Sequence, residues 1–433
     1  MEKYFELEKN NTTVKTEILA GVTTFLAMMY IIVVNPGIIS ATGMPFSGVL
    51  TATVLVCAFS SIAMGIYAKT PIALAPGMGL NAFFTFGVVL GMKVPWETAL
   101  GAVFWSGIVF IILSVFNVRT HIVKAIPKQL RYAVAAGIGL FITMIGFVNA
   151  GFIVDNPATL VGFAGIKSAV TITFVIGLII TAILVVKRIK GALILGIAIT
   201  TIIAIPIGRL YGGDVTQVAY KGIFSAPDFS VFLKLDFIGS LKLAMWPVIF
   251  AFLFTDMFDS LSTFIGVAEA ADLVDEQGEP KNVKQCLIVD SISTTISGLF
   301  GTSSGTSYIE SATGVEEGGR TGLTTVVTGI LFIPFMFFSP LLSVVPAIAT
   351  APALVLVGVF MMKPVCKINW TNFDDSIPAF LALILIPLTY SITQGIVWGF
   401  LSWTLIKLFT GKIKEITPAL IIIDIFAILA LVL

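Results

Sequence analysis

The chain is a succession of apolar stretches, most of them about as long as a membrane-spanning helix. The hydrocarbon core of a bilayer, roughly 30 Å thick, requires about 20 apolar residues in a helix. Charged residues make up only 11% of the 433 residues and hydrophobic residues 57%, whereas typical soluble domains carry about 25% charged residues. The sequence therefore predicts an all-α polytopic membrane protein, a multi-pass protein of the cell membrane surrounded by lipid bilayer.

Fourteen of the apolar stretches fall into two sets of seven. The first set covers 17–36, 47–67, 71–91, 97–116, 131–152, 168–186 and 191–208; the second covers 245–271, 283–298, 304–318, 321–338, 350–362, 376–391 and 393–410. The last apolar stretch, 417–433, makes one segment too many. Either it is an extra span, or the short stretches between 376 and 410 form one broken element.

Basic residues in the short loops predict the orientation. They gather after the fourth, sixth and twelfth segments, at Arg119, Lys124, Lys128, Arg131, Lys187, Arg188, Lys190, Lys363 and Lys367. These loops are expected in the cytoplasm, and residues 1–16 with them. The first seventeen residues are charged and polar and lack the apolar core of a secretory signal, so they are expected to remain on the mature protein.

Seven segments in each half place the two halves in the membrane in opposite senses, as in transporters built from inverted repeats. Weak internal similarity agrees with this. The stretches IPKQLRYAVAAGIGLFITMIG (126–146) and VPAIATAPALVLVGVFMMKPV (345–365) occupy corresponding places, and each has a proline near its start and small residues before an apolar end.

The third segment of each half is expected to be broken. TPIALAPGMGLNAFFTFGVVLG contains Pro71, Pro76, Gly77 and Gly79, which do not fit one regular helix. In the second half, residues 301–322 are punctuated by glycines, and Thr306–Ile309 is β-prone. Paired unwound segments in the membrane indicate a binding site, because their free backbone groups need protein, water or ligand beside them. The simpler alternative for each break is a kinked helix or an external loop.

Away from the ends of the apolar stretches the charged residues are carboxylates, at Asp256, Asp259, Asp290, Glu310 and Asp424, with no Lys or Arg at matching depth. An unpaired carboxylate in the membrane has to take up a proton, bind a cation or face water, which suits ion-coupled transport. Asp256, Asp259, Thr263 and Gly266 share one stripe of their helix, so that helix is expected to line a cavity or an interface. Asp290 is expected near a helix end or in a hydrogen bond between helices, and Asp424 is expected to be structural.

Other classes of function find no support in the sequence. A net charge of +1 offers no basic surface for nucleic acid. Three single cysteines and one histidine, His121, give no metal-ligand pattern, so neither a metal nor another cofactor is expected.

Three motifs carry a resemblance to a known family: APGMGLNAFF (75–84), FTDMFDS (254–260) and GTSSGTSYIESATGVEEGGRTGLT (301–324). In this order and spacing they resemble the azaguanine-type purine permeases, a branch of the nucleobase cation symporters related to xanthine and uracil permeases. The resemblance implies fourteen segments in two inverted repeats of seven, as in uracil permease, with short antiparallel strands in segments 3 and 10. It divides the chain into a core domain (17–116 and 245–338) and a gate domain (117–210 and 339–433), joined by an external connection at 211–244.

The resemblance also implies a function and a site. Such proteins are not enzymes; they import purine nucleobases (guanine, hypoxanthine or adenine) together with protons, by alternating access between core and gate. The substrate-binding residues carried over by motif position, or placed beside it, are Gly77, Asn81, Phe83, Asp256, Asp259, Thr306 and Glu310. Asp256 and Glu310 are the expected proton-coupling residues, with Asp256 toward the ligand and Asp259 in support. Phe83, just past the predicted break, could stack on a planar ligand.

Two alternative functions are retained. An anion exchanger of the same architecture would need basic residues or bare helix N-termini at its site. An intramembrane aspartyl protease would use Asp256 and Asp259, although its carboxylates normally lie on separate segments. The sequence leaves three questions open: which base is preferred, whether protons or sodium drive uptake, and whether a homodimer forms.

Overall fold

The computed structural model describes residues 2–116, 127–211, 222–271 and 282–432. The loop residues Arg119, His121 and Lys124 therefore lie outside the described part. Eight described helices are long and apolar enough to cross a membrane: Val14–Thr42, Phe46–Ala68, Trp96–Val115, Lys128–Asn149, Ala169–Val186, Leu243–Ala268, Ala347–Lys367 and Ile392–Phe409. Shorter apolar helices cover Met78–Gly91, Ala192–Gly208 and Gly322–Phe337. The chain is a mostly helical multi-pass membrane protein.

The contacts between the long helices divide them into two groups. The first contains α2 (Val14–Met28), α3 (Ile31–Ile39), α4 (Phe46–Ala63), α6 (Trp96–Val115), α11 (Trp246–Ala271), α12 (Val283–Phe300) and α14 (Gly322–Phe332). In it, α14 packs against α2 and α4, and α12 against α6. The second contains α8 (Lys128–Asn149), α9 (Ala169–Val186), α10 (Ala192–Tyr211), α16 (Ala347–Met361), α17 (Phe373–Leu388) and α18 (Ile392–Phe409). In it, α8 packs against α16 and α17, and α9 against α10.

Short elements join these helices. They are α1 (Glu2–Phe5), η1 (Ser40–Thr42), η2 (Met64–Ala68), η5 (Gly239–Leu241), η6 (Leu243–Met245), η7 (Ile333–Phe337), α15 (Ser339–Leu342), η8 (Lys363–Lys367) and η9 (Ile413–Glu415). Four of the long helices begin directly after a proline, at Pro45, Pro95, Pro127 and Pro346. Proline has a fixed φ and no N–H to donate, so it stands well at a helix start.

Two short strands cross inside the first group. Strand β1 (Leu74–Pro76) pairs antiparallel with β4 (Gly305–Ser307), with Leu74 opposite Ser307 and Pro76 opposite Gly305. All six residues are buried. Each strand leads into a helix: β1 into α5 (Met78–Ala82), which continues as the π-helical η3 (Phe83–Gly91), and β4 into α13 (Ser311–Glu316).

Hydroxyl groups complete the hydrogen bonding of β1. The Leu74 N–H donates to Ser61 Oγ, and the Ser61 hydroxyl donates back to the Leu74 carbonyl, both over 3.0 Å. The Ala73 N–H donates to Ser311 Oγ, also over 3.0 Å. A two-stranded sheet buried in a membrane protein needs such partners, because its free backbone groups have no water to bind.

Two glycines allow α8 and α16 to approach closely. A Cβ at Gly139 would lie 2.9 Å from the Gly358 carbonyl oxygen, and a Cβ at Gly358 would lie 2.5 Å from the Gly139 oxygen. Both glycines belong to the similar stretches 126–146 and 345–365. The two stretches therefore face each other in the structure.

The stretches between 376 and 410 form two helices, α17 and α18, that pack against each other across a short turn. The terminal stretch forms a further helix, α19 (Pro418–Val432), which packs against α18 and α11. The rings of Phe426 and Phe250 stack there, with centroids 5.0 Å apart. The structure thus favours an additional terminal helix over one broken element at 376–410.

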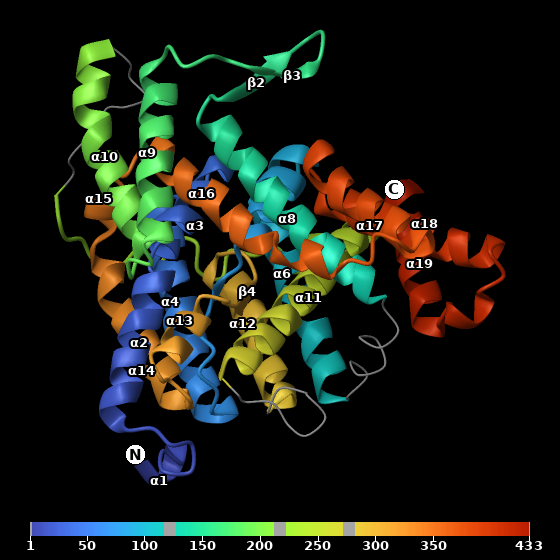
Figure 1. Ribbon diagram of the computed structural model, residues 1–433, viewed down its shortest axis with the longest axis horizontal. Coiled ribbons are helices and arrows are strands. Elements are labelled where there is room, and N and C mark those ends of the chain that lie inside the picture. Colours follow the sequence, from blue (N-terminus) through green and yellow to red (C-terminus); the bar gives the residue numbers. More distant parts are fainter. Residues whose placement is uncertain (1, 117–126, 212–221, 272–281, 433) are drawn as a thin grey trace.

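A β-hairpin that the sequence did not suggest projects from the helices (Figure 1). It consists of β2 (Ile153–Asn156) and β3 (Leu160–Phe163), between α8 and α9. Asn156 and Pro157 begin its turn, a pair typical of turns.

A buried glutamate joins α2 to α14. Glu17 is fully buried, and its carboxylate accepts hydrogen bonds from the Arg320 N–H (2.9 Å), the Thr321 N–H (3.3 Å), the Thr324 N–H (3.2 Å) and the Thr324 hydroxyl (2.6 Å). These amides lie at the N-terminal end of α14, where a helix has unpaired N–H groups and a partial positive charge.

Candidate functional site

A pocket of about 60 Å³ opens beside the crossing strands. Its lining comes from both helix groups: Tyr30, Met78, Gly79, Asp259, Thr263, Ser307, Tyr308, Ile309 and Glu310 from the first, and Val357, Phe360 and Met361 of α16 from the second. None of these residues is Lys, Arg or His. The pocket therefore combines carboxylates, hydroxyls and aromatic rings without a basic side chain.

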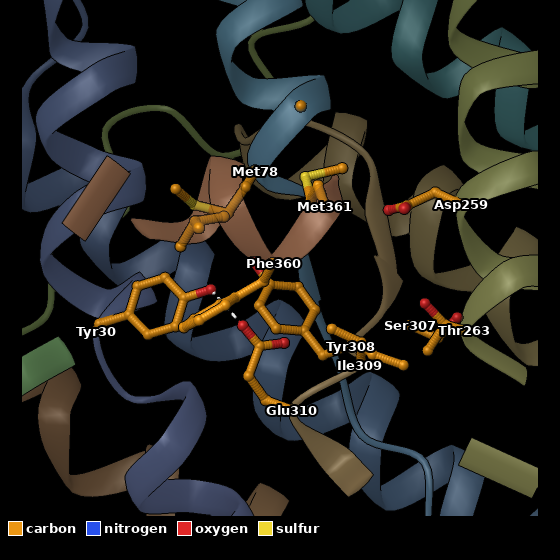
Figure 2. Close-up of a pocket in the computed structure, with 12 residues that line it drawn as sticks. Tyr30, Met78, Asp259, Thr263, Ser307, Tyr308, Ile309, Glu310, Phe360 and Met361 are labelled. Carbon is orange, nitrogen blue, oxygen red and sulfur yellow. Dashed lines mark hydrogen bonds between the residues drawn. The ribbon is translucent and has the colours of Figure 1, made fainter. Parts of the chain in front are cut away.

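Glu310 is held by a tyrosine from the start of the chain. The Tyr30 hydroxyl donates a hydrogen bond of 2.7 Å to Glu310 Oε1 (Figure 2). Tyr30 lies at the junction of α2 and α3 and is buried, whereas Glu310 directly precedes α13 and is partly exposed. Asp259 and Thr263 of α11 lie on the other side of the pocket in this view.

The two aspartates of α11 lie in different surroundings. Asp259 lines the pocket and is partly exposed. Asp256, one turn earlier, is fully buried, does not line the pocket, and forms a hydrogen bond with the Thr294 hydroxyl of α12. Residues three positions apart on a helix point in somewhat different directions, and here only one of the two carboxylates reaches the pocket.

Gly77 and Thr306 lie directly behind the pocket wall. A Cβ at Gly77 would lie 2.7 Å from Thr306 Cγ2, so glycine is needed for the two strand ends to approach. The Thr306 hydroxyl is 2.7 Å from Ser260 Oγ. Both predicted site residues therefore shape the strand crossing, and neither lines the pocket.

Asn81 and Phe83 fix the short helix that follows β1. Asn81 Nδ2 donates to Asn35 Oδ1 over 3.0 Å, and Asn35 Nδ2 is 2.8 Å from both Thr53 Oγ1 and Thr302 Oγ1. Phe83 packs against Phe252 with ring centroids 4.8 Å apart. Neither side chain lines the pocket, so of the predicted site residues only Asp259 and Glu310 do.

The first turn of α5 brings backbone donors to the pocket. Met78 and Gly79 line it at the start of the helical run Met78–Gly91. The first N–H groups of a helix have no partner within the helix and carry a partial positive charge. They are suited to acceptor atoms of a ligand.

Several lining residues had no clear signal in the sequence. Tyr30 stands in the apolar first segment and reaches the pocket only because the fold brings it to Glu310. Phe360 and Met361 belong to a helix whose composition is typical of any apolar span. Among the described residues, no cluster of three or more His, Cys, Asp or Glu could hold a metal ion.

Comparisons with known proteins agree with this arrangement. Residues 15–398 match the model of the Permease family of xanthine/uracil permeases. The chain is 44% identical to the adenine permease AdeP of Escherichia coli, covering 100% of this chain and 96% of that protein. It is 42% identical to the guanine/hypoxanthine permease PbuO of Bacillus subtilis, covering 98% of each.

Solved structures show the same fold at low identity. The transmembrane domain of the cyanobacterial bicarbonate transporter BicA superposes with a TM-score of 0.66 at 15% identity, covering 88% of this chain and 97% of that one. SLC26A9 superposes with a TM-score of 0.62 at 11% identity, covering 92% of this chain and 66% of that one. With the family match over most of its length, the chain belongs to the xanthine/uracil permease family and groups with its adenine and guanine/hypoxanthine permeases.

Proposed function

We propose that this protein imports purine nucleobases by proton symport, with guanine, hypoxanthine or adenine as substrate. The observation that carries the proposal is the pairing of Asp259 and Glu310 across one small pocket with aromatic walls. A purine presents N–H donors and ring acceptors on a flat frame. Carboxylates accept from the donors, helix N–H groups serve the acceptors, and rings stack on the face.

The names of the relatives support the substrate class. The similar proteins of Escherichia coli and Bacillus subtilis are named adenine and guanine/hypoxanthine permeases. At more than 40% identity over nearly the whole chain, a shared class of substrate is the simplest account.

Transport would proceed by movement of the two helix groups against each other. The first group would form the core domain (17–116 and 245–338), and the second would form the gate domain (117–210 and 339–433). One wall of the pocket belongs to α16 and the other walls to the core. A volume of about 60 Å³ is far below the roughly 300–1,000 Å³ of small-molecule sites. A base would therefore enter only when α16 moves away from Tyr30 and Glu310.

Two contacts support the proposed inverted repeats of seven segments. Gly139 and Gly358 are separated by the same 219 positions as the similar stretches that begin at 126 and 345, and they lie against each other. Strands β1 and β4, from the third segment of each proposed half, pair antiparallel. Corresponding elements of two repeats related by a two-fold axis lie against each other and run antiparallel where they meet on that axis. The N-terminus would then be cytoplasmic, as the basic loops predict.

The two alternative functions fit less well. An anion exchanger would hold its substrate with basic side chains or helix N-termini. The described pocket lining includes the start of α5 but no basic side chain, and its two carboxylates, when ionised, would repel an anion. A protease acting through Asp256 and Asp259 would need both carboxylates at one cavity, and Asp256 is fully buried away from it.

Uptake by purified protein in proteoliposomes tests the proposal. An inward proton gradient should drive accumulation of labelled adenine, guanine or hypoxanthine, and unlabelled competitors should rank the bases. Bicarbonate uptake without purine uptake would overturn the proposal in favour of anion transport.

A further inference from the structure

Asp290 is a buried carboxylate without a hydrogen-bond partner. It lies in the middle of α12 (Val283–Phe300) and is fully buried, and neither of its oxygens has a partner in hydrogen-bonding geometry. The Ser260 hydroxyl and the Ser307 N–H approach it without completing such a bond. Asp290 therefore does not lie near a helix end, whereas its expected interaction with a neighbouring helix is present through Ser260 of α11.

Asp290 shares its surroundings with Asp256. Thr294, one turn after Asp290 on the same face of α12, contacts the Asp256 carboxyl. Asp256 is also fully buried, and its Oδ1 has no partner. The two carboxyls interact electrostatically, and Asp259 acts on both. Among the described residues, the charged groups that act on the pair are all carboxylates.

Two neighbouring carboxylates buried without a cation cannot both be ionised. The hydrogen bonds around Thr294 indicate where a proton resides. The Thr294 hydroxyl is 3.0 Å from the Gly305 carbonyl oxygen and also contacts Asp256. A hydroxyl has one proton to donate, and a carbonyl only accepts. Both contacts are satisfied together when Thr294 donates to Gly305 and a protonated Asp256 donates to Thr294.

We propose that Asp256 and Asp290 form the site of the transported proton, separated from the base pocket by strand β4. This inference rests on the proposed proton symport and assigns the proton a place. When the pair gives up its proton, the Thr294 hydroxyl turns to the charged Asp256 and releases the Gly305 carbonyl.

Strand β4 connects the two sites. Gly305 contacts Thr294, and Thr306 contacts Ser260, on the side of the carboxyl pair. The next residues, Ser307 and Tyr308, line the base pocket. A base that binds Glu310 and Tyr308 therefore acts on the same short strand whose carbonyl senses the proton.

Proteoliposomes with an internal pH indicator test this assignment. Wild-type protein should take up protons together with the base. Asp290→Asn and Thr294→Val should lose base-dependent proton uptake. The internal concentration of base should then rise only to the external concentration, while exchange of internal for external base continues. Thr294→Ser keeps the hydroxyl and should behave as wild type.

Asp424→Asn is the matched control, because Asp424 is a buried carboxylate of α19 that does not belong to the Asp256–Asp290 pair. This variant should co-transport protons as the wild type does. Should Asp290→Asn fold poorly, Thr294→Val and Asp256→Asn carry the test. A double Asp256→Asn/Thr294→Val variant should lose no more proton uptake than either single variant, because both changes affect the same proton.

Normal proton co-transport by Asp290→Asn or Thr294→Val would overturn the assignment while leaving purine transport intact. Accumulation driven by a sodium gradient instead of a proton gradient would overturn it as well. Failure of the wild-type protein to move any purine would instead reject the proposed function.

Discussion

The Tyr30 hydroxyl donates to Glu310 Oε1 over 2.7 Å and so ties the junction of the first two long helices to the start of α13. A carboxylate has two oxygens, and this bond occupies one of them. Under the proposed function, the other oxygen accepts an N–H from the base. Tyr30, which also lines the pocket, thus orients the Glu310 carboxylate.

Tyr30→Phe removes this bond and should lower the affinity for the base about tenfold, because a hydrogen bond to a charged group contributes roughly 1.5–3 kcal/mol. The apparent KM of uptake should rise more than the maximal rate falls. Tyr67→Phe, at an exposed tyrosine of η2, is the control. Equal kinetics for both variants would show that Tyr30 does not position Glu310.

Glu310→Gln should weaken binding of the native base by about ten- to a hundredfold and change the order of preference among purines. The amide offers one donor and one acceptor in place of two acceptors. Methylating the base at the nitrogen that donates to Glu310 should lower the affinity of the parent protein for the base much more than the affinity of the variant. Binding titrations with two or three methylated purines measure this, and equal losses in both proteins for every analogue would remove Glu310 from base recognition.

Gly79→Ala should abolish most transport at normal membrane abundance, since a Cβ there would lie 2.3 Å from Ile138 Cγ2 of α8. The contact joins α5 of the first helix group to α8 of the second, so the added methyl group would hold the two groups apart. The second change Ile138→Ala should restore uptake in part. Gly37→Ala, where a Cβ meets nothing within 4 Å, serves as control.

Gly77→Val tests the strand crossing itself. Its Cβ would lie 2.7 Å from Thr306 Cγ2, so the ends of β1 and β4 would have to separate, and uptake should fall sharply at normal abundance. Normal uptake by this variant would mean that the crossing tolerates a side chain and that its close approach is not needed for transport.

Glu17→Ala should lower the thermal unfolding midpoint of the detergent-solubilised protein. It leaves the amides at the start of α14 without their acceptor, and an unsatisfied buried group costs roughly 1–3 kcal/mol. Glu8→Ala, at an exposed glutamate of the N-terminal segment, should leave the midpoint unchanged. A shift equal to that of Glu8→Ala would show that the amides find other partners.

The positions of the spans could be predicted because the length of an apolar stretch can be read directly from consecutive residues of the sequence. Pro76 and Gly77 likewise mark the end of β1, since their backbone preferences are local. The direction of each carboxylate was harder: Asp256 and Asp259 are one turn apart, and only the packing of α12 against the strands decides that Asp259 faces the pocket. Tyr30 could not be found at all from local sequence, because its importance depends on a partner 280 positions away.

The pairing of β1 with β4 also bears on how the chain is made. Pro76 and Gly305 are 229 positions apart, and translation at roughly 5–20 residues per second separates their synthesis by about 10–50 s. During that interval β1 is in place without its partner strand, and the bonds from Ser61 are among the few that its backbone can already form. The pocket beside the crossing strands therefore does not exist on a half-made chain, and a truncated first half inserted alone should remain a target for membrane quality control.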